Sequence, residues 1–489
     1  MKTITRFMYT LHRILGTLLS VLFLVWFLSA FVMMYHGFPR AGEAEKQAKQ
    51  ELLSLSDSLP PIDEVMARIP SGQKVNAVTI DRFLGQTVFR VRTPEQTYEL
   101  PAHATDTLPA ASGKRIAQIA ALWCKAPVAR IDTLTQLDQW IPFGKLREEF
   151  PIYKFHFDDA KKHELYIGSQ SGEVLQFTNR EERFWAWLGA IPHWVYFTWL
   201  RQDASLWSLT VSWLSGIGCL MVIAGMWIGI HSWRIARKGR GRFSPYRKRW
   251  YHWHYTTGII FGLFVLTFTF SGMMSLVEVP GWISQATLKV KPLREIRKGG
   301  ASPTDYPLDY RRVIAAYPNS LQLEWNNFRS VPYYTVKEKK NEFFIDASDT
   351  LPRALRLSKE QIVAGVKAIH GDSTTLHVSL LNRFETDYRD MSRMYSNRSL
   401  LPVWKITVAD ADGSCYYIHP ETGIVKYVNT PARWKYWMYT ALHRMRIGVL
   451  NSDATLRKSV LWVLLLGGTV CSLSGVILGV RYLRRKARF

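Results

Sequence analysis

Four long runs of apolar residues stand out along the chain. They cover Leu11–Tyr35, about Leu206–Trp233, about Tyr255–Val277 and about Ser459–Val480. A helix needs roughly 20 apolar residues to cross a bilayer, so each run is long enough to form a membrane-spanning helix. The first run is too long for a signal peptide, and no small-residue cleavage motif follows it, which predicts an uncleaved helix.

Two long segments between these runs have a different pattern. Residues 37–183 and 278–432 contain short stretches in which apolar and polar residues alternate, such as AVTIDRF and YYTVKEKKNEFFIDA. This alternation is typical of strands with one buried face. In the first segment, HELYIGSQSGEVLQF indicates two strands joined by a turn at Ser171-Gly172. Stretches with helical spacing, such as KEQIVAGVKAIHG, accompany the strands, so each segment is predicted to be an α+β domain.

Two further helices are expected at the membrane surface. A straight helix from His193 to His231 would be roughly 57 Å long, which exceeds the hydrocarbon core of about 30 Å. The full prediction is: membrane helix 1–36, α+β domain 37–183, interfacial helix 184–204, membrane helix 205–233, basic loop 234–250, membrane helix 251–277, α+β domain 278–432, interfacial helix 433–450, membrane helix 458–482 and tail 483–489.

The basic residues predict the orientation of the chain. The formal net charge is +24, and the N-terminus, the loop Arg234–Arg249 and the tail Arg481–Phe489 are basic without any acidic residue. Basic loops stay in the cytoplasm, so both termini are expected there and the α+β domains on the opposite side. In a bacterium this describes an inner-membrane protein with two periplasmic domains. Topology and attraction to anionic lipid account for the basic runs, so a nucleic-acid partner is not expected.

The chain also repeats its own pattern. HRILG (His12–Gly16) and HYTTG (His254–Gly258) share the spacing H-x-x-x-G, and Ser29 and Ser271 follow the two histidines by 17 residues. A second match aligns His193 with His443 and continues without a gap to the glycines of AGMWIGI and SGVILGV. A helix, an outer domain and a helix thus occur twice. This implies an internal duplication with a pseudo-two-fold axis along the membrane normal.

Such an axis would bring His12 to His254 and His193 to His443. Two imidazoles that face each other are natural axial ligands for a haem iron, and helix bundles hold such cofactors in their cores. Arg13 and Arg444 directly follow two of these histidines and could pair with haem propionates. A metal or proton path and a purely structural role remain the alternatives from the pattern alone.

Other residues and motifs carry less chemistry. His252, His231 and His36 are secondary candidates for ligands, and an interfacial role suits each of them better. The sequence contains no Ser-His-Asp set, HExxH motif, phosphate loop or dinucleotide fingerprint, so no catalytic residue is assigned. It also contains no CxxCH, so a haem would not be attached covalently by that motif.

The H-x-x-x-G helix starts, the strand ends of the form (Y/I)-x-x-x-(S/T)-G-x-V, and the histidines within AIPHW and ALHRM resemble the PepSY-associated transmembrane family. The resemblance implies a bacterial inner-membrane protein with four membrane helices and two periplasmic PepSY-type domains. The best-understood members are di-haem siderophore reductases, which implies two b-type haems here. By position, His12 and His254 match the family's inner histidines, and His193 and His443 match its outer ones.

The expected function is therefore electron transfer across the membrane. A cytoplasmic reductase or a quinol would supply electrons, and a ferric siderophore or another ferric chelate in the periplasm would be reduced. The alternative is a haem-free PepSY scaffold or regulator that binds a periplasmic partner or peptidase. A metal or proton transporter ranks last, because it would need acidic groups within the four apolar runs, which contain none.

Overall fold

The fold was examined in a computed structural model that describes residues 2–53, 59–103, 113–240, 243–283, 288, 290–297, 300–388 and 400–488. The chain divides into two compact units. The first comprises residues 1–41, 126–279 and 434–489, and the second comprises residues 42–125 and 280–433. Each unit therefore contains pieces that are distant in the sequence.

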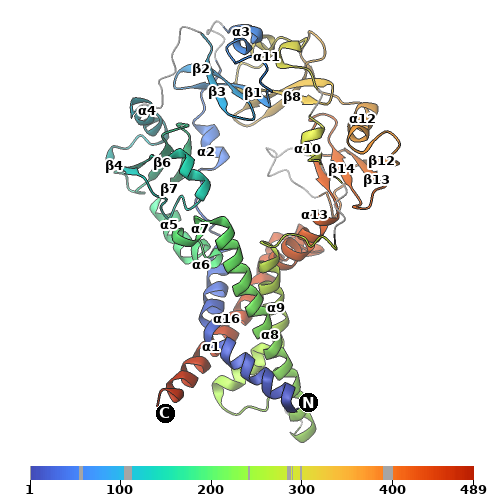
Figure 1. The fold of residues 1–489 in the computed structure, drawn as a ribbon. Coiled ribbons are helices and arrows are strands. Elements are labelled where there is room, and N and C mark those ends of the chain that lie inside the picture. Colours follow the sequence, from blue (N-terminus) through green and yellow to red (C-terminus); the bar gives the residue numbers. More distant parts are fainter. Residues whose placement is uncertain are drawn as a thin grey trace. The chain divides into compact units, whose positions relative to one another are not determined.

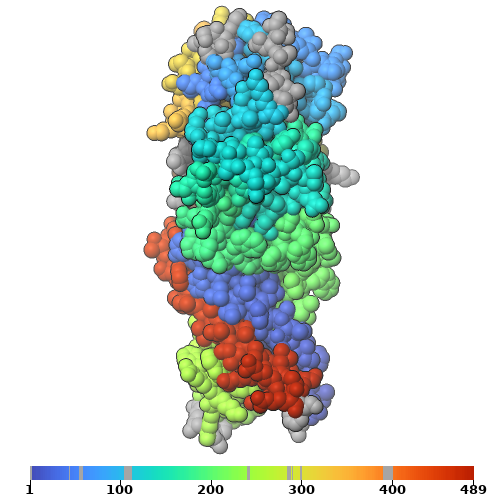
Figure 2. Space-filling view, turned by 90° about the vertical axis from the view of Figure 1, so that its left-hand side faces the viewer, coloured from blue at the N-terminus to red at the C-terminus, as the bar shows by residue number. Residues whose placement is uncertain are grey.

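Four long helices dominate the first unit. They are α1 (Lys2–Met33), α8 (Ala204–Arg240), α9 (Arg249–Met274) and α16 (Ala454–Lys486). Among the described residues, these are the helices that are long and apolar enough to cross a membrane. Helix α1 packs against α8 and α16, and α9 packs against the same two helices, so the four form a closed bundle (Figure 1). Figure 2 shows α1 in blue beside α16 in red.

Aromatic side chains fill the middle of this bundle and pack directly on glycines of neighbouring helices. A Cβ atom on Gly218 would lie 2.7 Å from the Phe23 ring. Similarly, a Cβ on Gly467 would overlap Phe261, and one on Gly468 would overlap Phe27. Small residues allow close packing of membrane helices, where no hydrophobic effect drives helix association. These three glycines thus allow aromatic rings to pack between the helices.

The first unit also contains a four-stranded antiparallel sheet. Its strands occur in chain order: β4 (Val128–Leu134), β5 (Ile152–Phe157), β6 (Glu164–Gly168) and β7 (Val174–Thr178). The predicted turn between the last two strands is confirmed, and Gly172 within it has a φ of 68°, a conformation that favours glycine. Three short helices then lead to α8, namely α5 (Arg180–Leu188), α6 (Ala190–Trp194) and α7 (Thr198–Arg201).

A seven-stranded antiparallel sheet organises the second unit. Its order is β11-β10-β9-β8-β1-β2-β3. Three strands come from the first segment: β1 (Ala77–Phe83), β2 (Gln86–Arg92) and β3 (Thr97–Pro101). The other four come from the second segment: β8 (Ser320–Phe328), β9 (Val331–Glu338), β10 (Glu342–Asp346) and β11 (Arg353–Ala354). Strand β1 pairs with β8, so the two segments share one sheet.

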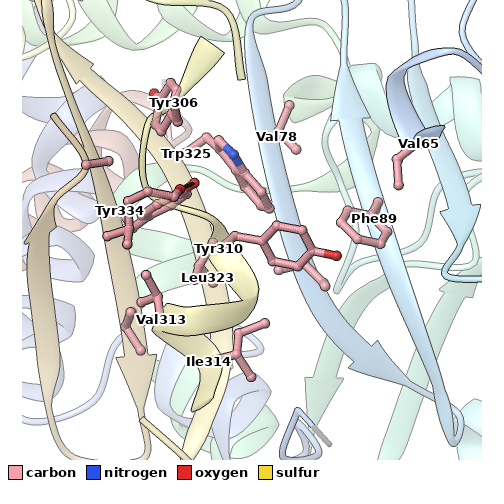
Figure 3. Packing of buried hydrophobic residues seen from close by; sticks show 14 of the residues in the cluster. Val65, Val78, Phe89, Tyr306, Tyr310, Val313, Ile314, Leu323, Trp325 and Tyr334 are labelled. Carbon is pink, nitrogen blue, oxygen red and sulfur yellow. Dashed lines mark hydrogen bonds between the residues drawn. The ribbon is translucent and has the colours of Figure 1, made fainter. Parts of the chain in front are cut away.

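One hydrophobic core of this unit lies on one face of the shared sheet. Alternating residues of β1 and β8, such as Val78 and Leu323, point to the same side, where α3 (Ile62–Met66) and α11 (Tyr310–Ala316) cover them. Figure 3 shows Tyr310 between Phe89 and Trp325, with ring centroids 5.8 and 5.3 Å away, respectively. Aromatic packing across the β1–β8 junction therefore joins residues from both segments into one core.

The second unit ends in another four-stranded antiparallel meander. It consists of β12 (Leu376–Leu381), β13 (Val403–Val408), β14 (Cys415–Ile418) and β15 (Val425–Val428), with α12 (Lys359–His370) packed against it. Other short elements of the unit are α2 (Glu43–Ala48), α4 (Gly113–Trp123), α10 (Pro292–Glu295) and the 3-10 helix η2 (Pro303–Asp305).

The structure departs from the predicted division into one domain for 37–183 and one for 278–432. Residues 126–183 belong with the bundle, whereas strands β1 to β3 join the second segment's sheet. An edge strand exposes unpaired backbone groups that another strand can satisfy, and alternation alone does not reveal which strand does so. The helix ends differ as well: α8 continues to Arg240, because the polar stretch after Trp233 contains no proline and has good helix formers.

The expected interfacial helices at 184–204 and 433–450 are each broken into shorter pieces. The first region contains most of α5 together with α6 and α7. The second contains the end of α13 (Thr430–Lys435), a π-helical segment η3 (Tyr436–Ala441), α14 (Leu442–Arg444) and α15 (Val449–Ser452). Val195 and Met445 end α6 and α14 in the left-handed conformation, with φ values of 54° and 49°. These breaks place His193 and His443 on short helices at matching positions.

Candidate functional site

The first unit brings the four candidate histidines together as two pairs. His12 on α1 faces His254 on α9, and their ring centroids are 5.9 Å apart with an interplanar angle of 36°. We call these two residues the first pair. His193 on α6 faces His443 on α14, with centroids 6.1 Å apart and an angle of 55°. These two residues are the second pair.

Each histidine of the first pair is held by a neighbouring membrane helix. The Nδ1 atom of His12 lies 2.9 Å from the carbonyl oxygen of Met221 on α8. The Nδ1 atom of His254 lies 3.1 Å from the carbonyl oxygen of Cys471 on α16. A mid-helix carbonyl retains a second lone pair beyond its helical hydrogen bond, so it can accept this contact without breaking the helix.

The second pair is held in the same manner by the other two helices. The Nδ1 atom of His193 lies 3.2 Å from the carbonyl oxygen of Trp26 on α1. The corresponding distance from His443 to Phe268 on α9 is 3.1 Å. Carbonyl oxygens only accept hydrogen bonds, so Nδ1 carries the proton in all four rings. The proton-free lone pair is therefore on Nε2.

The four Nε2 atoms make no hydrogen bond with any part of the chain that the structure describes. The four histidines are partly buried, and a purely structural imidazole in such a position commonly bonds to the protein through both ring nitrogens. A metal–imidazole bond is about 2 Å long, so two rings that bind one ion from opposite sides have centroids about 6 Å apart. Both observed separations fit this arrangement.

The donor set fits haem better than a bare metal ion. Among the described residues, no cluster of three or more His, Cys, Asp or Glu side chains could hold a metal. Haem needs only axial ligands from the protein, because its porphyrin occupies the other positions around the iron. Metal-binding histidines also commonly donate their second N–H to a backbone carbonyl, which fixes the ring orientation. All four histidines have this feature.

Glycines leave open space beside the first pair. Gly16 and Gly258 follow His12 and His254 by four residues, so they lie on the same helix faces. A Cβ on Gly16 would meet no other protein atom within 4 Å, and one on Gly258 would meet only the Cys471 sulfur at 3.9 Å. These glycines therefore do not serve to accommodate a protein side chain. The free space suits a flat group lying against each helix.

Burial keeps the second pair neutral. Loss of solvent lowers the pKa of His193 to about 4. Burial also lowers the pKa of His443 to about 4, with a smaller contribution from the neighbouring His193. The ordinary value is about 6.5, so both imidazoles are uncharged at neutral pH. An uncharged imidazole is the form that binds a metal.

The other predicted residues are not part of the two pairs of rings. Arg13 is exposed, and its guanidinium carbon lies 5.1 Å above the Tyr482 ring, while Arg444 is exposed beside His443. His252 is exposed, and His36 stacks on Trp185 at 4.5 Å. His231 lies on α8 and is partly buried. None of the three alternate histidines faces another imidazole among the described contacts.

Several residues near the second pair were not singled out from the sequence. Arg201 lies among the rings of Phe143, Tyr196 and Trp207, at 5.0, 5.1 and 4.6 Å from their centroids. The Trp207 indole also donates to the carbonyl oxygen of Trp194, at 2.8 Å, which ties α8 to the segment after His193. The aromatic residues of this region thus form a packed cluster around a cation.

Comparison with known proteins identifies a family. A family model described as the PepSY-associated TM region matches residues 75–485, which is more than half of the chain. The match includes His193, His254 and His443, whereas His12 precedes it. No curated protein matches the chain.

Proposed function

Because the chain belongs to the PepSY-associated transmembrane family, we propose that it is a membrane protein that binds two b-type haems and acts as a ferric reductase. The first pair would hold one haem and the second pair the other. Electrons would come from a cytoplasmic reductase or a quinol. The substrate would be a ferric siderophore or another ferric chelate in the periplasm.

One observation supports this proposal most strongly. All four histidines donate Nδ1–H to a backbone carbonyl of one of the four long helices and leave Nε2 unpaired. In each pair the second imidazole lies about as far away as the two axial ligands of one haem iron would. A pair of structural histidines would gain more by bonding Nε2 to the protein. The recurrence of the same incomplete bonding at both pairs favours a missing partner with two axial positions.

The orientation of the protein is part of the proposal. The basic N-terminus, α8–α9 connection and C-terminus favour the cytoplasm of a bacterial inner-membrane protein. In this orientation the first pair would lie near the cytoplasmic side and all three sheets would lie in the periplasm. An internal duplication accounts for the matched contacts. Met221 and Cys471 occupy equivalent positions of the repeat, as do Trp26 and Phe268.

The residues of the chain would contribute position and shielding. The histidines hold the ligands, and the aromatic rings seated on Gly218, Gly467 and Gly468 fill the bundle between the pairs and exclude water. Haem supplies one-electron redox chemistry when bound. The ferric iron of the chelate gains one electron and becomes ferrous. Its lower charge weakens its attraction to hard oxygen ligands, which releases the iron.

The test is an optical spectrum of the detergent-purified protein, oxidised and dithionite-reduced, with a pyridine haemochrome count. We expect a low-spin spectrum and about two b haems per chain, one for each histidine pair. Reoxidation of the reduced protein by a ferric chelate then tests the reductase activity. A protein that stays colourless when haem is supplied during expression would contradict the proposal. The chain would then be better described as a haem-free PepSY scaffold or regulator.

A further inference from the structure

Three of the four histidines make a second contact at Nδ1, with a buried serine. Ser29 Oγ lies 3.2 Å from His193 Nδ1, Ser271 Oγ lies 3.1 Å from His443 Nδ1, and Ser474 Oγ lies 3.1 Å from His254 Nδ1. The three serines are at most 2% exposed. They stand on three different helices, so the contact recurs independently of one local environment.

Each serine also bonds to the carbonyl that holds the same histidine. The hydroxyls of Ser29, Ser271 and Ser474 donate to the carbonyl oxygens of Trp26, Phe268 and Cys471, at 3.1, 3.2 and 2.7 Å. In each case the acceptor lies three residues before the serine. Each serine, carbonyl and imidazole therefore form a closed triangle, which we call a serine triangle.

The direction of the hydrogen bonds follows from the acceptors. The serine's only proton goes to the carbonyl, so the serine oxygen is free to accept from Nδ1–H of the histidine. The imidazole proton is then shared between two acceptors. This arrangement fixes the tautomer with the proton on Nδ1 and restrains rotation of the ring, and so also the position of Nε2. Such outer contacts also raise the basicity of a metal-binding histidine.

His12 lacks this serine. Its Nδ1 contacts the Met221 carbonyl at 2.9 Å, and the residue three positions later is Ala224. The His12 ring instead packs closely on Gly225, where a Cβ atom would lie only 2.6 Å from His12 Cε1. The equivalent distance from Gly475 to His254 is 3.4 Å. His12 is thus held by one hydrogen bond and close packing, whereas His254 is held by a serine triangle.

We propose that Ser29, Ser271 and Ser474 are positioning residues for three of the four haem ligands, and that Ala224 makes the two ligands of the first pair unequal. This inference rests on the proposed di-haem function. It assigns the second pair two triangles and the first pair one. Removal of a serine should therefore affect only the haem whose histidine it contacts.

The experiment measures haem retention, midpoint potential and the low-spin electron paramagnetic resonance signal of each haem. The variants are Ser474→Ala and Ala224→Ser for the first pair and Ser271→Ala for the second. Ser215→Ala is the control, since Ser215 is 4% exposed on α8 and has no hydrogen bond to a histidine among the described residues. Single-ligand variants identify which signal belongs to which pair.

Ser474→Ala should weaken haem retention at the first pair about tenfold, the lower end of the effect of outer-shell changes at metal sites. A less basic ligand stabilises ferric iron less, so the potential of that haem should rise. A tenfold change in the relative binding of the two oxidation states corresponds to about 59 mV for one electron. Ala224→Ser should lower the same potential, and Ser271→Ala should move only the other haem. A merely structural serine would not shift a potential selectively.

The outcomes separate the two proposals. A wild-type protein without haem would overturn both. A wild-type protein with two haems whose Ser474→Ala and Ala224→Ser variants match Ser215→Ala in retention, potential and resonance signal would overturn the positioning role alone. If Ser474→Ala fails to fold, Ala224→Ser decides the question, because it adds a hydroxyl beside an existing acceptor and removes no contact.

Discussion

The four paired histidines differ from His370 and His156, which lie outside the pairs, in the ring nitrogen that the protein occupies. In the pairs, Nδ1 donates to a backbone carbonyl and Nε2 has no hydrogen bond to the described residues. By contrast, Nε2 of His370 on α12 lies 2.8 Å from the Tyr416 hydroxyl, and Nε2 of His156 on β5 lies 2.8 Å from an Asp132 carboxylate oxygen. His370 has only 5% of its side chain exposed. Burial therefore does not distinguish His370 from the paired histidines, whereas the bonding of Nε2 does.

This contrast gives a physical criterion for a ligand. A buried imidazole that already bonds through both nitrogens, or bonds through Nε2 to a hydroxyl or carboxylate, is satisfied by the protein. An imidazole that lies about 6 Å from a second imidazole and leaves its Nε2 unpaired is not. By this criterion only the first and second pairs qualify among the histidine contacts described for this chain.

The largest expected effect is the loss of one haem when a ligand is removed. His254→Ala should abolish haem at the first pair, and His443→Ala should abolish it at the second, so each variant should retain about one haem per chain by pyridine haemochrome assay. Each replacement removes one of two axial bonds and leaves its partner unsupported. His12→Ala and His193→Ala should behave as their partners do.

Histidines outside the pairs provide the controls for this prediction. His252→Ala changes an exposed side chain two residues from His254, and His370→Gln changes a buried one on α12. Both variants should keep two haems. Loss of a haem in His370→Gln would contradict the contrast between the paired histidines and His370. Loss of a haem in His252→Ala would indicate that His252, and not His254, is the ligand.

A smaller but still selective effect is expected from Gly225→Ala. The added Cβ would lie 2.6 Å from Cε1 of His12, closer than side chains pack, so the ring must leave its present position. We expect several-fold weaker haem retention at the first pair and no change at the second. Gly475→Ala is the matched variant: its Cβ would be 3.4 Å from His254 Cε1, and it should have a milder effect. Equal retention in both variants would mean that this packing does not position His12.

The sequence predicted the bundle well because its signals are local. Apolar length identifies a membrane helix, and the spacing from His12 to Ser29 repeats from His254 to Ser271, so the repeat paired the histidines that the structure brings together. The family assignment is likewise confirmed. The roles of Arg13 and Arg444 toward propionates stay predictions.

The shared sheet could not be predicted in the same way. Strand β1 has the alternation of a half-buried strand, but its partner β8 lies more than 200 residues later, and either edge could in principle pair elsewhere. The serine triangles were also missed. Ser29 and Ser271 were visible as repeat markers, whereas Ser474 has Ala224 at its equivalent position, so comparison of the repeats gave no signal for it.

Removal of haem should change hydrogen exchange around the second pair and leave the seven-stranded sheet nearly unaffected. A ligand that binds only the folded state stabilises that state, so haem extraction should increase amide hydrogen exchange in α6 and α14, the short helices that carry the second pair. Exchange in the seven-stranded sheet should stay within about twofold of its original rate, because none of its residues contacts a candidate ligand among the described contacts. Hydrogen exchange with mass spectrometry on the full chain, before and after extraction, measures both. Equal changes in the two regions would argue against a site confined to the bundle.

The smallest expected effect is a pH dependence of stability around His370 on α12. Burial lowers the pKa of His370, and the Asp410 carboxylate 3.8 Å away offsets this only in part. The unfolded chain therefore binds a proton more readily than the folded chain, and stability falls as the pH is lowered from about 6.5. Protection of α12 and β14 against hydrogen exchange, corrected for the intrinsic rate, should decline between pH 7 and 5. His370→Gln should flatten this decline, whereas His377→Gln, at an exposed position of β12, should not. An unchanged slope in His370→Gln would mean that His370 is as easily protonated in the folded chain as in the unfolded one. The contrast between His370 and the paired histidines would then rest on hydrogen-bond geometry alone.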